Sequence, residues 1–141
     1  MLSDKKGYDE ADRLELFRLR PVAGNEGDEM ELKVSHEQGY VLATTVGVVD
    51  DAARKLFREL LHPLVGQSGT NVVLDLSQSS HITSDGIAQV VSLVTHANAS
   101  GSRVVLAACS PFISEVLNHC KLNTFFEMAD SVPDAIRRVL G

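Results

Sequence analysis

The sequence has few of the residues and motifs that mark enzymes or disulfide-stabilised proteins. It holds two cysteines, Cys109 and Cys120, which do not form a Cys-x-x-Cys pair, so we interpret both as reduced, buried thiols. The five histidines are scattered, and the HExxH, GxGxxG and phosphate-loop patterns are absent. We therefore expect no catalytic residue, no metal site and no cofactor.

The chain also lacks a surplus of positive charge and any long apolar run. Its net charge is −6, whereas proteins that bind nucleic acids carry a basic face, so we expect no nucleic-acid partner. No stretch of about 20 apolar residues is present, so direct membrane insertion is not expected. The first residues lack the apolar segment of a signal peptide, which predicts a cytoplasmic location.

The length of 141 residues fits one folded domain with an N-terminal extension. Residues 1–29 form the extension, and we expect its polar first part, 1–12, to be flexible. Residues 13–20 are compatible with a bulged or short edge strand, and 21–29 have the composition of a loop. The folded domain is predicted over residues 30–141.

Within this domain the apolar pattern predicts strands that alternate with helices. The predicted strands are 30–35, 40–46, 71–76, 104–108 and 124–128. The predicted helices begin near 50–51, 84, 110–111 and 131–132, and Pro63 ends the first of them near Leu61–His62. The order β-β-α-β-α-β-α-β-α indicates an α/β fold, with a mixed, largely parallel sheet, an N-terminal hairpin and about four α-helices.

The segment 79–87 is the candidate binding site, because it joins the buried strand 71–76 to the start of a helix. Binding sites in parallel sheets form beyond the carboxyl ends of strands, and a helix N-terminus there favours negative charge. The structural alternative is that Thr83 or Ser84 only caps the helix while Asp85 complements its dipole. A hydrolase built from Ser84, His81 and Asp85 is disfavoured, since catalytic triads are assembled from distant parts of a fold.

The segments 71–77 (NVVLDLS) and 82–87 (ITSDGI) resemble the signature of the STAS domain family, an apolar strand ending in Asp-Leu and then Asp-Ser-Ser-Gly-Leu. Gly101, the strand 104–108, Ser110-Pro111, Val116-Leu117 and Phe125-Phe126 follow in the order found in bacterial anti-sigma-factor antagonists. The resemblance covers residues 30–140. It implies a STAS fold for the domain 30–141.

The resemblance implies partner switching rather than enzymatic activity. Such antagonists bind an anti-sigma factor that is also a serine kinase; phosphorylation weakens the complex, and a serine phosphatase restores it. This sequence departs from the family at Thr83, which replaces the first Asp, and at Asp85, which replaces the usual acceptor serine. An acid at this position cannot accept the phosphate, so Asp85 either imitates the phosphorylated form or leaves Ser84 and Thr83 as the candidate phosphorylation sites.

The predicted partner-binding surface is the 79–87 loop and the exposed face of the following helix, where Ser92 and His96 also lie. Its residues are Ser80, His81, Thr83, Ser84, Asp85, Gly86 and Gln89. Asp75, at the end of the preceding strand, is expected to hold the loop by accepting backbone amides. The alternative function is a STAS scaffold subunit of a stress-signalling or transporter complex, without phosphate cycling. In either case we expect a monomer or a weak dimer.

Overall fold

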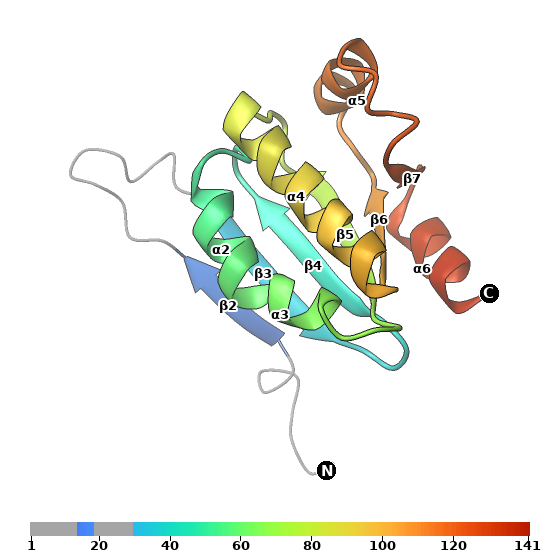
Figure 1. Cartoon of the computed structure of the whole chain (residues 1–141). Helices are drawn as coiled ribbons and strands as arrows, with labels where there is room; N and C mark the ends of the chain where they lie inside the picture. Colours follow the sequence, from blue (N-terminus) through green and yellow to red (C-terminus); the bar gives the residue numbers. More distant parts are fainter. Residues whose placement is uncertain (1–13, 19–29) are drawn as a thin grey trace.

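The computed structural model of this chain describes residues 14–18 and 30–141 (Figure 1). The predicted flexible tail over 1–12 and the predicted loop over 21–29 lie outside these residues. The strands are β2 (Leu14–Arg18), β3 (Glu31–His36), β4 (Val41–Val46), β5 (Asn71–Gln78), β6 (Arg103–Ala107) and β7 (Glu127–Ala129). The helices are α2 (Ala52–Leu60), α3 (His62–Val65), α4 (Ser84–Ser100), α5 (Pro111–His119) and α6 (Val132–Leu140).

One six-stranded sheet carries the fold, in the order β2-β3-β4-β5-β6-β7. Strands β2, β3 and β4 pair antiparallel, whereas β4 to β7 pair parallel because helices make the crossovers between them. The predicted α/β class, with a mixed and largely parallel sheet and an N-terminal hairpin, is thus confirmed. Strand β2 stands at the sheet edge, within the segment 13–20.

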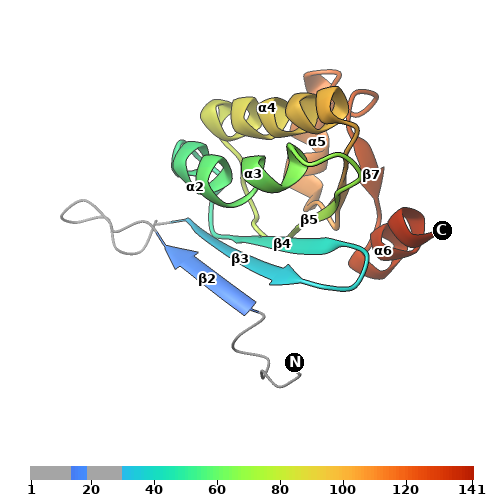
Figure 2. The same ribbon diagram turned by 60° about the horizontal axis from the view of Figure 1, so that its bottom comes forward.

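Helices cover both faces of the sheet. Figure 2 shows α2, α3 and α4 on one face and α6 on the other. Strand β5 has neighbours on both sides and is buried from Val72 to Leu76, as a central parallel strand should be. Leu74 belongs to the main core beneath α2 and α4, while Val73 belongs to a second, smaller core beneath α6. The middle of β5 is therefore packed on both faces.

Three sequence predictions need correction. The described residues contain five helices, not about four, because Pro63 cannot continue α2 but suits the first turn of the short helix α3. The last strand is 127–129 instead of 124–128, since the amides of Phe125 and Phe126 bond to Leu122 in a turn. Cys120 is exposed, because it follows the last turn of α5, whereas Cys109 is half-buried.

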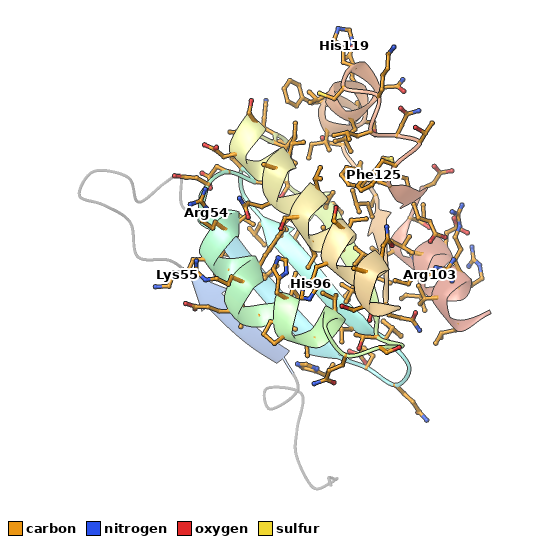
Figure 3. The ribbon with its side chains drawn as sticks, in the orientation of Figure 1. Arg54, Lys55, His96, Arg103, His119 and Phe125 are labelled. Atoms are coloured by element: carbon orange, nitrogen blue, oxygen red, sulfur yellow. The ribbon has the colours of Figure 1, made fainter. Side chains whose placement is uncertain are left out.

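A histidine pair joins α3 to α4. The Nδ1 atoms of His62 and His96 lie 2.7 Å apart, and the two rings stack with their centroids 5.0 Å apart. Figure 3 shows His96 on the side of α4 that faces α2 and α3, so it does not belong to the exposed face expected from the sequence. A proton on both facing nitrogens would break this contact, because neither would then have an electron pair to accept with.

We predict that the stability of the protein falls below about pH 6.5 because of this pair. Burial lowers the pKa of His62, and the charge of His96 lowers it further. Once the pH falls through the ordinary value of 6.5, the unfolded chain binds more protons than the folded one. The contribution of His62 is thus fully present above that pH and is lost below it. Urea unfolding at about pH 7.5 and about pH 5.5 measures the difference.

The matched variants are His62→Gln and His119→Gln, the second of which changes an exposed histidine on α5. We expect the pH dependence between those two conditions to shrink in His62→Gln and to stay unchanged in His119→Gln. An unchanged dependence in both variants would show that the histidine pair is not its source.

Candidate functional site

The site begins where β5 ends, and buried polar side chains fix that end. Asp75 is only 8% exposed, and its Oδ1 accepts from the amide of Ser77 at 2.9 Å. The Thr44 hydroxyl donates to Asp75 Oδ2 at 3.3 Å, and the buried hydroxyls of Thr45 and Ser79 lie 2.6 Å apart. Asp75 thus accepts a backbone amide, as predicted. Because buried polar groups are costly to leave unpaired, these bonds hold the chain in one path as it leaves the sheet.

The segment after β5 then runs beside the loop that joins β4 to α2. Gly47 N donates to Gln78 O at 3.1 Å, Val49 N to His81 O at 3.1 Å, and Thr83 N to Val49 O at 2.9 Å. Val49 and Ile82 form an isolated parallel bridge, and both side chains are buried in the main core. The two loops are therefore one backbone-bonded unit beyond the carboxyl edge of the sheet.

Helix α4 starts on this unit. Thr83 is the N-cap residue, and its Oγ1 accepts from the amide of Gly86 at 3.1 Å. Ser84 and Asp85 form the exposed first turn, where the carboxylate complements the helix dipole. The hydroxyl of Ser84 has no hydrogen-bond partner among the described residues, whereas that of Thr83 is engaged in the cap. Of the two capping candidates, Thr83 and not Ser84 is therefore the cap.

Gly86 permits the close approach of α4 to the neighbouring loop. A Cβ atom at this position would lie 2.1 Å from the carbonyl oxygen of Val49 and 2.7 Å from its carbonyl carbon. Only a residue without a side chain allows the first turn of α4 to sit against that carbonyl. Gly86 belongs to the predicted partner-binding set but is buried, so its place in the site is structural.

Helix α5 also contributes to the site, which sequence reasoning missed. The Ser110 hydroxyl, which caps α5, donates to the carbonyl of Ser80 at 3.0 Å. The ring of His81 lies 4.6 Å from that of Phe112, and Ser80 Oγ lies 2.7 Å from His81 Nδ1. Ser80 and His81 are exposed, whereas Gln89, on α4, is half-buried. The Ser110-Pro111 start of α5 was visible in the sequence, but nothing there places it beside Ser80.

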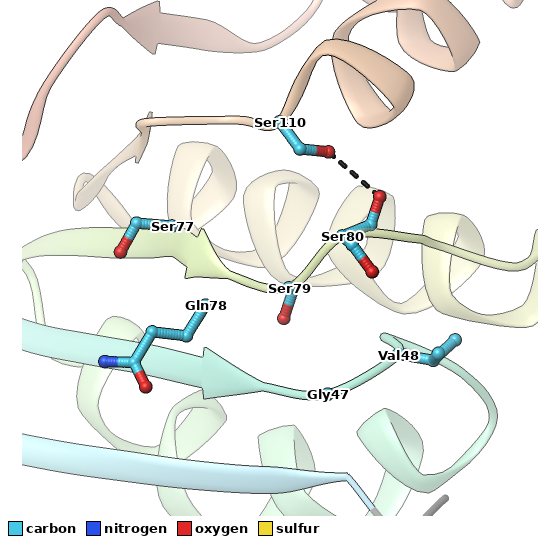
Figure 4. Close-up of a pocket in the computed structure, with 7 residues that line it drawn as sticks. All are labelled: Gly47, Val48, Ser77, Gln78, Ser79, Ser80 and Ser110. Atoms are coloured by element: carbon cyan, nitrogen blue, oxygen red, sulfur yellow. Dashed lines mark hydrogen bonds between the residues drawn. The ribbon is translucent and has the colours of Figure 1, made fainter.

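A pocket of about 400 Å³ opens between these segments, and Figure 4 shows the residues around it. They are Gly47, Val48, Ser77, Gln78, Ser79, Ser80 and Ser110. None of these seven has an ionisable side chain, so the pocket offers hydroxyl and amide groups but no acid or base for proton transfer near neutral pH.

Two further features of the described part of the chain bear on function. Over residues 30–141, no three His, Cys, Asp or Glu side chains gather as a metal site. Among the helices of that same part, none combines the length and the apolar character needed to span a bilayer.

Comparison with known proteins points to one family. The model of the STAS domain matches residues 31–135. An anti-sigma factor antagonist from Mycobacterium paratuberculosis is similar in structure, with a TM-score of 0.69 and 17% identity over 79% of this chain and 95% of that one. The antagonist SpoIIAA in its unphosphorylated form has a TM-score of 0.61 and 21% identity, over 78% of this chain and 98% of its own.

A serine-to-glutamate variant of RsbS from Moorella thermoacetica is also similar, with a TM-score of 0.67 and 17% identity. That match covers 77% of this chain and 94% of the RsbS chain. At such low identities, the three structures demonstrate a shared fold.

We predict that Gly86→Ala lowers the free energy of unfolding by about 1–3 kcal/mol, because the new methyl group meets the Val49 carbonyl. Helix propensity alone predicts the opposite sign, since alanine stabilises a helix interior relative to glycine by about 1 kcal/mol. Denaturant unfolding therefore separates the two effects.

Gly66→Ala is the matched control. Gly66 has an ordinary φ of −68°, and a Cβ there would lie 3.3 Å from its nearest neighbour, the carbonyl oxygen of His62. This substitution should change stability by less than about 1 kcal/mol. A Gly86→Ala protein as stable as the wild type would show that α4 can move away from Val49.

Proposed function

The chain belongs to the STAS domain family, and from this premise we propose that it is a protein-binding regulator of the anti-sigma-factor-antagonist type. Its partner is an anti-sigma factor that is also a serine kinase, and the two act by partner switching in the cytoplasm. The observation that carries the proposal is the exposed first turn of α4, Ser84 and Asp85, set on a backbone-bonded platform. A binding surface that is rigid before contact loses little conformational entropy on association.

Between the two candidate acceptors, the structure favours Ser84. Its hydroxyl is exposed and unbonded among the described residues, whereas Thr83 would have to give up the cap of α4 to receive a phosphate. A phosphate on Ser84 would add roughly −1.5 to −2 charges beside Asp85. Against a partner surface that fits one carboxylate and a neutral hydroxyl, this added charge finds no group to pair with and weakens the complex. A serine phosphatase would restore it.

Asp85 supports a second candidate, a scaffold subunit of a stress-signalling or transporter complex that does not cycle phosphate. The carboxylate stands directly before Gly86, where the family pattern has the acceptor serine, and it is exposed. It therefore presents a permanent negative charge at this position. In the scaffold the carboxylate would form a constant part of the interface.

We predict that Asp85→Lys weakens binding by about tenfold or more, because it reverses the charge at the centre of the proposed interface. The measurement is titration calorimetry against each purified anti-sigma factor kinase encoded by the source genome. Asp130→Lys makes the same charge change at an exposed residue between β7 and α6 and should bind like the wild type. Unchanged binding by a folded Asp85→Lys protein would refute the proposed site.

We also predict that the binding kinase transfers one phosphate to Ser84 in the presence of ATP and that the complex then dissociates. Intact mass and peptide mapping measure the transfer, and gel filtration measures dissociation. Ser84→Ala should abolish the transfer, whereas Ser92→Ala, an exposed serine two turns further along α4, should retain it. A stable complex that never gains phosphate would instead support the scaffold function.

A further inference from the structure

Helix α5 exposes an aromatic side chain beside the proposed interface. It begins just beyond β6 and projects from the body of the molecule (Figure 1). Ile113 and Leu117 bury its inner side in the main core, but Phe112 is 44% exposed. The other large apolar side chains exposed in the described residues are Phe125 and Leu140. Since aromatic side chains often act as anchors in protein interfaces, Phe112 marks a candidate contact.

Phe112 borders a hollow of about 320 Å³ along the outer side of α5. Its walls are the side chains of Phe112, Glu115, Val116, His119 and Cys120. Most of this surface is hydrocarbon or thiol, and Glu115 and His119 supply its ionisable groups. Glu115 is exposed and has no ion-pair partner among the described residues. The hollow therefore suits an apolar side chain that has a basic neighbour.

The hollow adjoins the segment that leads into α4. The ring of His81 lies 4.6 Å from that of Phe112, and the Ser110 hydroxyl ties the start of α5 to the carbonyl of Ser80 at 3.0 Å. A partner that covers the exposed residues Ser80 and His81 therefore also reaches Phe112. This contact distinguishes Phe112 from Phe125, which is 42% exposed but packs on Phe126 and does not line the hollow.

We propose that the α5 hollow is the second half of the partner interface and that it takes an apolar side chain of the anti-sigma factor, with an adjacent lysine or arginine placed on Glu115. The inference rests on the proposed function and extends it from the charged turn of α4 to an apolar anchor site on α5. Phe112 is the contact residue at its centre.

The first test compares Phe112→Ala with Phe125→Ala, two truncations of equally exposed phenylalanines. Binding to the purified kinase that recognises the wild type should weaken by about tenfold or more for Phe112→Ala and by less than about threefold for Phe125→Ala. Thermal unfolding checks that both variants are folded. If both bind like the wild type while Asp85→Lys does not, the α5 inference is wrong and the proposed function stands.

The two cysteines allow a second, independent test. Cys120 is exposed and lines the hollow, whereas burial raises the pKa of Cys109 to about 11 and keeps that thiol protonated at neutral pH. Iodoacetamide should therefore modify Cys120 first, and a bound partner should slow this reaction about fivefold or more by covering it. An unchanged rate in the saturated complex would overturn the inference.

A third arm separates failure of the inference from failure of the proposed function. If no anti-sigma factor kinase binds the wild type, the proposed function is wrong, and benzoylphenylalanine is then placed at position 112 or 125 in source cells. The hollow remains a docking site if a protein cross-links at 112 but not at 125 and binds purified Phe112→Ala about tenfold more weakly than the wild type. The absence of such a cross-link overturns the inference as well.

Discussion

The backbone of Val49 is the contact on which the rest of the site depends. Its amide donates to the carbonyl of His81, and its carbonyl accepts from Thr83 and leaves no space for a Cβ at Gly86. The Val49 side chain is fully buried in the main hydrophobic core, so side-chain packing fixes the same residue that these backbone bonds fix. Because a buried peptide group is costly to leave unpaired, the two loops keep their register. The first turn of α4 is consequently fixed by contacts within the fold itself.

This arrangement separates the stability of the fold from the chemistry of the exposed turn. The hydroxyl of Thr83 caps α4, and the lack of a side chain at Gly86 lets the first turn approach the Val49 carbonyl. Ser84 and Asp85 are exposed to solvent. Negative charge at a helix N-terminus is favourable, so neither a carboxylate at Asp85 nor a phosphate on Ser84 opposes the helix. An acid at position 85 is therefore compatible with the start of α4, and in the proposed function its effect would fall on the partner.

The predictable features are those whose cause is local in sequence. The alternation of apolar and polar residues from Met30 to Val34 marks β3. The side chains of Thr83, Ser110 and Asp75 accept hydrogen bonds from backbone amides two or three residues away. The predictions that were wrong, and the contacts that were missed, have other causes. Phe125 and Phe126 look like a strand because they are apolar, yet only Phe126 is buried. The pairing of His81 with Phe112, and of Val49 with Gly86, joins segments far apart in the chain, and one sequence carries no signal for such contacts.

An apolar contact on α5 beside a charged contact on α4 would let the affinity of a partner interface and its response to phosphorylation vary separately. In the proposed switch, an apolar anchor on α5 would not change with phosphorylation, so it would contribute affinity in every state. The turn at Ser84 and Asp85 carries the charge, and charged groups at interfaces govern selectivity and release more than total affinity. The Asp85 carboxylate belongs to the proposed interface in every state, so only a phosphate on Ser84 would add repulsion, and binding would then draw on contacts that are indifferent to charge. Phe112, linked to the charged turn through His81, is placed to supply them.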